Sequence, residues 1–145
     1  MSSGLTSLPT WILTSAAGRS HQILQARLAR AGVNGYEYRC VAALAVEDHL
    51  SQTELGAAAV LDPRDISHTV RALEGRGLIS RTKDPRHGRR QLVSLTAEGR
   101  RMAERLAGVI AEVQELVFRD LKTDERVALL KLLERVARSE PTAAR

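Results

Sequence analysis

Two helix starts lie eleven residues apart near the middle of the chain, and they constrain its fold more than any other feature. Ser51 with a glutamate three residues later has the form of a capping box, in which each side chain accepts a hydrogen bond from the other residue's backbone amide. Asp62 followed by Pro63 repeats the signal, because aspartate caps free amides and proline at the first helical position loses no hydrogen bond. The sequence therefore predicts two short helices, over residues 51–59 and 63–75, joined by a tight turn.

The second of these helices has an apolar face and a polar face. Ile66, Val70 and Leu73 recur at spacings of four and three, which places them on one side of a helix. The opposite side carries side chains that can hydrogen-bond, and these are Arg64, Ser67, His68 and Arg71. A short helix of this kind, set at a tight turn after another, fits the major groove of DNA, which is about 12 Å wide. We therefore expect a helix-turn-helix in which these four residues contact base edges or nearby phosphates.

A β-hairpin is predicted directly after the helix-turn-helix. Residues 78–83 and 90–95 have the composition of strands, and residues 84–89 between them are rich in turn formers. This tip carries Arg86 and Arg89 and almost no apolar residue, so it can lay guanidinium groups on phosphates or in a narrow minor groove. The order of elements favours a DNA-binding wing over an ordinary basic loop.

The position of the net charge agrees with a polyanionic partner. The chain carries a net charge of +5 at pH 7, and residues 62–101 hold ten basic and five acidic side chains, whereas the rest holds twelve of each. The whole excess therefore lies in the helix-turn-helix and the hairpin, as expected for a surface that faces DNA. Charge alone is equally compatible with a solvated basic face that has no partner.

Amphipathic helices flank this central module. They are predicted from Pro9 to Gly32, from Asn34 to near His49, from Thr96 to near Leu121, and from a cap at Thr123 into the C-terminal region. The outer helices need a partner for their apolar faces, because the module already has a small core of its own. A second copy of the chain is the simplest partner, and a two-fold axis would set the recognition helices about one turn of DNA apart on a pseudo-palindromic site. A monomeric helical cap folded onto the module is the alternative.

The predicted fold is mainly α with a small β-hairpin wing (α+β), in a single domain that spans residues 1–145. Residues 34–96 form the winged helix-turn-helix lobe, and residues 8–32 and 97–138 form the dimerisation helices. The composition agrees with this fold, because 43% of the residues are hydrophobic but only 3% are aromatic, and alanine and leucine dominate.

Other classes of protein are disfavoured. No stretch approaches the roughly 18 apolar residues of a membrane span and residues 1–9 lack the features of a signal peptide, so we expect a cytoplasmic protein with no membrane partner. The single cysteine, Cys40, lies at an apolar helical position, which favours a buried structural thiol over a redox sensor. The four histidines are scattered, so we expect no metal and no cofactor. We find no nucleophile with a positioned base and no phosphate-cradling loop, so an enzyme is not expected.

Four segments carry a resemblance to a known family: residues 55–62 (LGAAAVLD), 73–81 (LEGRGLISR), 84–86 (DPR) and 95–99 (LTAEG). On these residues the chain resembles the MarR family of bacterial transcriptional regulators over nearly its whole length, and the wing followed by Leu-Thr-x-x-Gly is the most specific part. The resemblance implies a triangular homodimer with recognition helices in consecutive major grooves, wings in the flanking minor grooves, and Arg89 as the wing-tip arginine.

Three positions depart from the pattern of this family. His87 and Gly88 stand where the wing usually has a second aspartate and a further basic residue, so Asp84 is the local partner expected for Arg89. Val60 stands at a turn position that is often glycine.

The resemblance also implies a small anionic or phenolic effector, bound where the dimerisation helices meet the DNA-binding lobe. Trp11, Ser15, Arg19 and Tyr38 are the residues we expect there, with Arg19 as the anion partner and the rings as apolar walls. The predicted function is a sequence-specific regulator of transcription that binds double-stranded DNA, a repressor released by its effector. The alternative is a winged-helix protein-interaction module without sequence-specific DNA binding.

Overall fold

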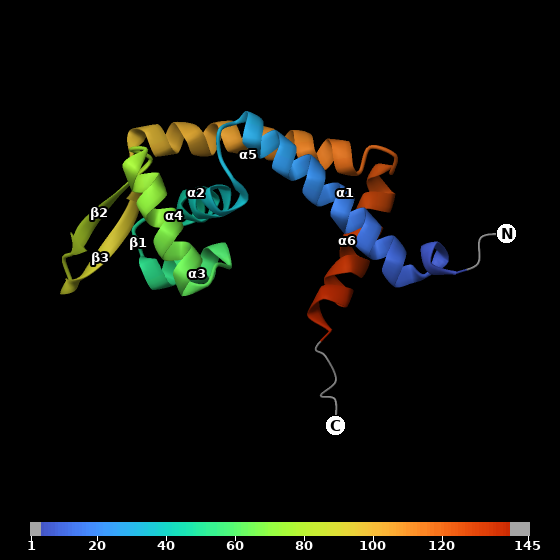
Figure 1. Ribbon diagram of the computed structural model, residues 1–145, viewed down its shortest axis with the longest axis horizontal. Helices are drawn as coiled ribbons and strands as arrows, with labels where there is room; N and C mark the ends of the chain where they lie inside the picture. The colour runs from blue at the N-terminus through green and yellow to red at the C-terminus, as the bar shows by residue number, and fades with distance from the viewer. Residues whose placement is uncertain (1–3, 140–145) are drawn as a thin grey trace, which may run out of the picture.

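In the computed structural model, which describes residues 4–139, six α-helices and a three-stranded antiparallel sheet form an elongated molecule (Figure 1). The helices are α1 (Pro9–Arg30), α2 (Gly35–Val46), α3 (Gln52–Ala59), α4 (Pro63–Gly75), α5 (Ala97–Val117) and α6 (Thr123–Arg138), with a short 3-10 turn, η1 (Leu5–Ser7), before α1. The strands are β1 (Leu50–Ser51), β2 (Ile79–Asp84) and β3 (His87–Leu95). The sequence-based fold class, mainly α with a β-hairpin wing, is confirmed.

The core of the molecule lies in the lobe formed by α2, α3, α4, the sheet and the first half of α5. The predicted inner face of α4 is confirmed, because Ile66, Val70 and Leu73 are all buried. Cys40 and Val41 of α2 are fully buried against the same core. Burial of these side chains fixes α4 with its polar face outward.

A third strand was not predicted. β1 pairs antiparallel with β3, with Leu50 opposite Val93, so that the strand order is β1-β3-β2. The loop before β1 is tied to the sheet by Asp48, whose carboxylate accepts a hydrogen bond from the Leu95 amide at 3.1 Å. This loop begins where α2 ends at Val46, three residues before the predicted end near His49.

The wing is longer and its tip is tighter than predicted. Only Pro85 and Arg86 separate β2 from β3, whereas the sequence pattern assigned all of residues 84–89 to the turn. A register shift after Lys83 sets Asp84 opposite His87, and the buried Asp84 carboxylate accepts a hydrogen bond from the Arg86 amide at 2.9 Å. That hydrogen bond closes the turn within two residues.

The start of α5 explains the Leu-Thr-x-x-Gly segment. The Thr96 hydroxyl accepts from the Gly99 amide and donates to the Gly77 carbonyl at 2.6 Å, which joins the start of α5 to the turn after α4. A Cβ atom at Gly99 would lie 2.0 Å from the carbonyl oxygen of Leu78. Only glycine therefore allows α5 to approach the start of the wing this closely.

Two predicted boundaries in the C-terminal region are wrong. α5 ends at Val117 rather than near Leu121. Thr123 is the first residue of α6 rather than its cap, because the Glu125 carboxylate reaches back to the Lys122 amide at 2.8 Å and makes Lys122 the N-cap.

At the far end of the molecule, few side chains of the described residues are buried. α1 crosses α5, and α6 turns back beneath them at the end remote from the wing (Figure 1). Large apolar side chains on η1, α1 and α6 remain exposed there, and they include Leu5, Leu8, Trp11, Ile12, Leu13, Val127, Leu130, Leu132 and Val136. Among residues 4–139, no helix combines the length and the apolar character that a membrane span requires.

Candidate nucleic-acid interface

The turn between α3 and α4 is held in a conformation that is unusual for its sequence. Val60 adopts left-handed backbone angles, φ 55° and ψ 52°, and the Leu61 amide donates to the Gly56 carbonyl at 2.9 Å. The Asp62 carboxylate then caps α4 by accepting from the Asp65 amide at 2.8 Å. Val60 therefore adopts a backbone conformation that glycine reaches easily and that is disfavoured for valine.

The outer face of α4 carries the polar side chains that the sequence analysis selected. Arg64, His68 and Arg71 are exposed and Ser67 is half-buried. Within the described part of the chain, none of these four side chains forms a hydrogen bond or an ion pair. Their donors are therefore available to an external partner.

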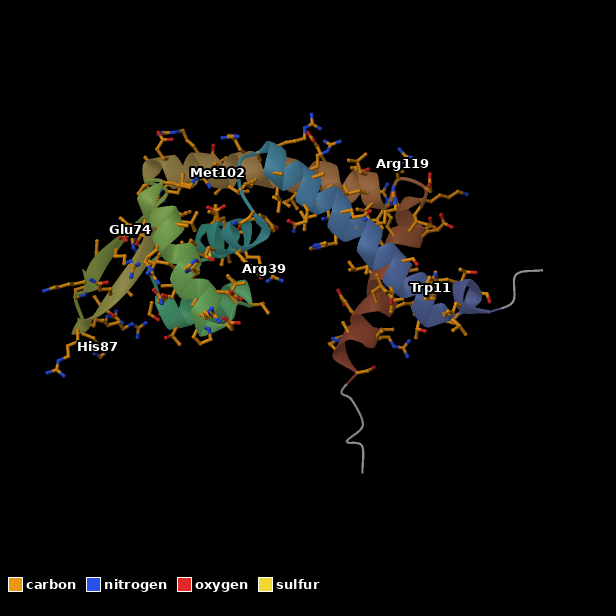
Figure 2. All side chains as sticks on the ribbon, viewed as in Figure 1. Trp11, Arg39, Glu74, His87, Met102 and Arg119 are labelled. Carbon is orange, nitrogen blue, oxygen red and sulfur yellow. The ribbon has the colours of Figure 1, made fainter. Side chains whose placement is uncertain are left out.

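The wing tip presents a second group of free cations. Arg86 and Arg89 are exposed, and the tip, marked by His87 in Figure 2, lies on the side of the lobe turned away from α5, as does the start of α4. Neither arginine has an acidic partner within residues 4–139. The expected pairing of Asp84 with Arg89 is wrong, because Arg90 approaches Asp84 instead, with 3.6 Å between Nε and the carboxylate.

Arg90 was not selected from the sequence, and it connects the wing to the helix-turn-helix. Its guanidinium forms an ion pair with Glu54 in the first turn of α3 as well as with Asp84. Hydrogen bonds from the Ser51 amide and hydroxyl, and then the Arg90 guanidinium, hold the pKa of Glu54 below its ordinary value. The same carboxylate thus caps α3 and anchors the wing.

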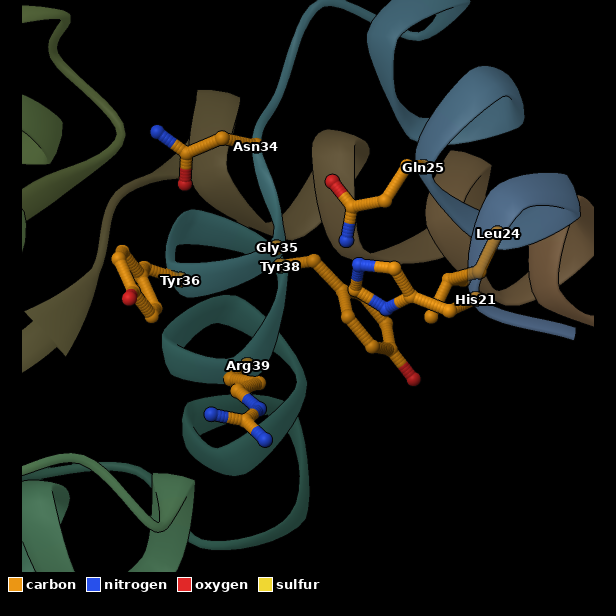
Figure 3. A pocket seen from close by; sticks show the side chains of 8 residues that line it. All are labelled: His21, Leu24, Gln25, Asn34, Gly35, Tyr36, Tyr38 and Arg39. Atoms are coloured by element: carbon orange, nitrogen blue, oxygen red, sulfur yellow. The ribbon is translucent and has the colours of Figure 1, made fainter. Parts of the chain in front are cut away.

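A hollow of about 550 Å³ lies between α1 and the start of α2. Its lining is drawn in Figure 3 and consists of His21, Leu24, Gln25, Asn34, Gly35, Tyr36, Tyr38 and Arg39. His21, Gln25 and Tyr38 converge on one side, whereas Tyr36 projects from the other side of α2 (Figure 3). Aromatic walls with an imidazole, an amide and a guanidinium suit a small aromatic anion.

Of the four residues predicted for an effector cleft, the structure brings only Tyr38 to this hollow. Trp11 lies near the far end of α1, and Ser15 lies one turn further along the same helix (Figure 2). Arg19 donates to the carbonyl oxygens of Val117 and Leu116, at 3.3 and 3.5 Å, and so caps the end of α5.

Cys40 is fully buried, as the sequence analysis favoured. Burial, with a smaller effect of the Glu37 carboxylate, raises the pKa of its thiol to about 12. At neutral pH the group is therefore a thiol and a poor nucleophile. Among residues 4–139, no group of three or more His, Cys, Asp or Glu side chains is arranged so that it could hold a metal ion.

Comparison with known proteins points to one family. The sequence model of the MarR family matches residues 31–90. The chain is 28% identical over 132 residues to the HTH-type transcriptional repressor NicR of Pseudomonas putida. The aligned residues make up 91% of this chain and 84% of NicR. The PcaV transcriptional regulator of Streptomyces coelicolor, solved with its natural ligand, is 30% identical, with a TM-score of 0.74 over 94% of this chain and 96% of PcaV.

A further solved structure includes DNA. The transcriptional repressor CouR, known from Rhodococcus jostii and solved on a 23-mer DNA duplex, is 27% identical, with a TM-score of 0.82 over 92% of this chain and 95% of CouR.

A pair of short helices with a buried inner face and an unpaired polar outer face, followed by an arginine-tipped hairpin, defines a winged helix-turn-helix protein of the DNA-binding class. Within that class the chain belongs to the MarR family of transcriptional regulators.

Proposed function

We propose that this protein is a homodimeric repressor that binds a pseudo-palindromic DNA site and is released from it by a small aromatic anion. One observation carries the proposal. Several arginines of the lobe are held by carboxylates, among them Arg76, Arg81 and Arg90, whereas the arginines of α4 and of the wing tip have no partner in the described chain. A polyanion such as DNA binds cations that are not already neutralised within the protein, and the free arginines lie together on one surface.

The two free groups have different roles on DNA. The donors on α4 lie on a helix of major-groove size, so Arg64, Ser67, His68 and Arg71 contact base edges and nearby phosphates. Arg86 and Arg89 lie at the tip of a hairpin that is anchored to α3, and they contact phosphates or the minor groove beside it.

A second copy of the chain is the partner proposed for the exposed apolar end. α6 buries none of its residues within its own chain. Between α5 and α6 there is a hollow of about 180 Å³ with an apolar lining that includes Phe118, Leu129 and Leu133. A two-fold arrangement that covers this end with η1, α1 and α6 of another copy buries these groups and sets two recognition helices on one face. Residues 8–32 and 97–138 are then the dimerisation helices, and residues 34–96 are the DNA-binding lobe.

The effector site proposed is the hollow between α1 and α2. Arg39 and His21 supply positive charge or hydrogen bonds for a carboxylate, and Tyr38 supplies an aromatic wall. A protein of the same fold supports this class of ligand, because the DNA binding of BpsR of Bordetella bronchiseptica is regulated by 6-hydroxynicotinic acid.

Selection of duplexes from a random library tests the proposal, because it measures DNA binding, specificity and half-site symmetry together. We expect enriched duplexes with an inverted repeat whose half-sites lie one helical turn apart. Recovery of no enriched sequence would contradict the proposal.

Two substitutions then separate the roles of the two groups. Arg71→Ala should weaken binding by about 1–3 kcal/mol and relax preference at one base position, whereas Arg89→Ala should weaken binding on all sequences and lower the salt dependence by about one ion. Arg119→Ala is the matched control, since it removes the same charge from the exposed turn after α5, far from the wing (Figure 2). The alternative, a protein-interaction module, predicts binding to duplexes with no steep dependence on salt.

A further inference from the structure

The first two turns of α2 serve two surfaces at once. Asn34, Gly35, Tyr36, Tyr38 and Arg39 line the hollow between α1 and α2. Glu37 and Arg39, on the same two turns, contact groups at opposite ends of the recognition helix α4. The inference below rests on the proposed function, and it concerns how a ligand in the hollow reaches α4.

One contact lies at the C-terminal end of α4. Glu37 is only 7% exposed, and its carboxylate accepts from the Asn34 amide at 3.0 Å and from the Arg76 guanidinium at 2.9 Å. Arg76 is the residue that ends α4, and its other guanidinium nitrogen donates to the Gly32 carbonyl at 2.8 Å. Two successive hydrogen bonds, through Glu37 and Arg76, therefore connect the backbone of Asn34, which lines the hollow, to the end of the recognition helix.

The other contact lies at the N-terminal end of α4. The Arg39 guanidinium, which lines the hollow, donates to the Val60 carbonyl at 3.4 Å. Val60 precedes the N-cap of α4 by two residues and already holds a strained backbone conformation. A carboxylate in the hollow competes with this carbonyl for Arg39, because charge-assisted hydrogen bonds to an anion are the stronger ones.

We propose that Glu37 and Arg76 are a positioning pair that couples occupancy of the hollow to the orientation of α4. A ligand that presses on the first turn of α2 displaces the Glu37 carboxylate with it, since the Asn34 cap holds Glu37 to that turn. Arg76 follows, because a buried carboxylate left without its cation is strongly disfavoured. The loss of the Arg39 contact at the other end frees the turn before α4, so both ends of the helix respond to one event.

The test places an anion in the hollow covalently, which removes the need to know the natural effector. Gln25 lines the hollow, and a Gln25→Cys variant is modified with sulfonatoethyl methanethiosulfonate. Cys40 is the only native cysteine, and its burial leaves it unreactive, so the label enters at position 25 alone. Val46→Cys is the matched control, because position 46 is exposed at the end of α2, does not line the hollow and lies outside the proposed dimerisation helices.

Affinity for a duplex enriched from the random library is measured by fluorescence anisotropy before and after modification. The expected result is a loss of about tenfold for the label at position 25 and no loss for the label at position 46. In Glu37→Gln or Arg76→Gln backgrounds the loss at position 25 should fall below about threefold. An equal loss with and without the pair, or no loss in the protein that retains the pair, would overturn the proposal.

Hydrogen exchange of the α4 amides provides a readout that does not involve DNA. Modification at position 25 should accelerate exchange over residues 63–75, and this change should disappear in the Glu37→Gln background. Glu37→Gln keeps an oxygen for the Asn34 amide, so it guards against the unfolding that loss of the whole side chain risks. Unchanged exchange in the protein that retains the pair would overturn the coupling. A change in exchange without binding to any duplex would support the coupling and refute the DNA-binding function.

Discussion

The strained turn before α4 offers a quantitative test of the structure. Val60 lies in the left-handed region, which costs a non-glycine residue about 1–2 kcal/mol, and a β-branched side chain belongs at the upper end of that range. The side chain is 77% exposed, so its removal loses little apolar burial. Against this, glycine loses roughly 0.5–1 kcal/mol more backbone entropy on folding. Val60→Gly should therefore raise the free energy of unfolding by about 1 kcal/mol.

Urea denaturation followed by circular dichroism measures this change, with all variants at one protein concentration because association contributes to stability. A thermal scan should show a rise of about 3–4 °C. Val46→Gly is the matched control, since Val46 is 90% exposed but lies in the last turn of α2, where glycine lowers stability by up to about 1 kcal/mol. The same substitution should thus have opposite signs at the two sites. A Val60→Gly variant no more stable than the parent would refute the assigned turn geometry.

Three further predictions concern stability and reactivity. Gly99→Ala should destabilise the fold by about 3 kcal/mol or more in urea denaturation, because its Cβ would lie 2.0 Å from the Leu78 carbonyl oxygen, and a variant within 1 kcal/mol of the parent would contradict that packing. Cys40 should not react with Ellman's reagent in the native protein at pH 8 and should react fully in urea; rapid native reaction would show that the thiol is accessible. Because the pKa of Glu54 is lowered, its contribution to stability is present at neutral pH and is lost as the pH falls through the lowered value. Glu54→Gln should therefore lower the melting temperature at pH 7, and its difference from the parent should shrink as the pH falls, whereas a pH-independent difference would exclude this linkage.

The features of the lobe that sequence predicts correctly are those with local causes. The caps at Ser51 and Asp62 act within three residues, so the two short helices follow from nearest neighbours alone. The inward face of α4 follows from helical spacing, and the order of helix, helix and hairpin follows from the breaks between them. The structure confirms each of these predictions because the packing of the lobe favours the same local conformations.

The roles of adjacent wing arginines could not be separated in this way. Arg89 and Arg90 are neighbours in the sequence, but successive residues of a strand project from opposite faces. Arg90 therefore turns toward Glu54 and Asp84 while Arg89 projects outward. The sequence pattern assigned residue 89 to the turn and began the strand at 90, so it offered no alternation from which to assign the two faces. The register of β3 against β2, which depends on the shift after Lys83, decides which face of the wing each arginine occupies.

The lining of the hollow between α1 and α2 escapes prediction for a related reason. Helix α1 packs against both α5 and α2, and residues two positions apart on a helix lie about 200° apart around its axis. Arg19 therefore faces the end of α5 when His21 faces α2, and the two cannot line one hollow. Trp11 lies ten residues before His21, which is about 15 Å along the helix axis. Residue chemistry indicates which side chains suit an anion, but the packing of α1 on α5 decides which of them reach it, and that packing depends on contacts such as Arg27 with Glu112, 85 residues apart.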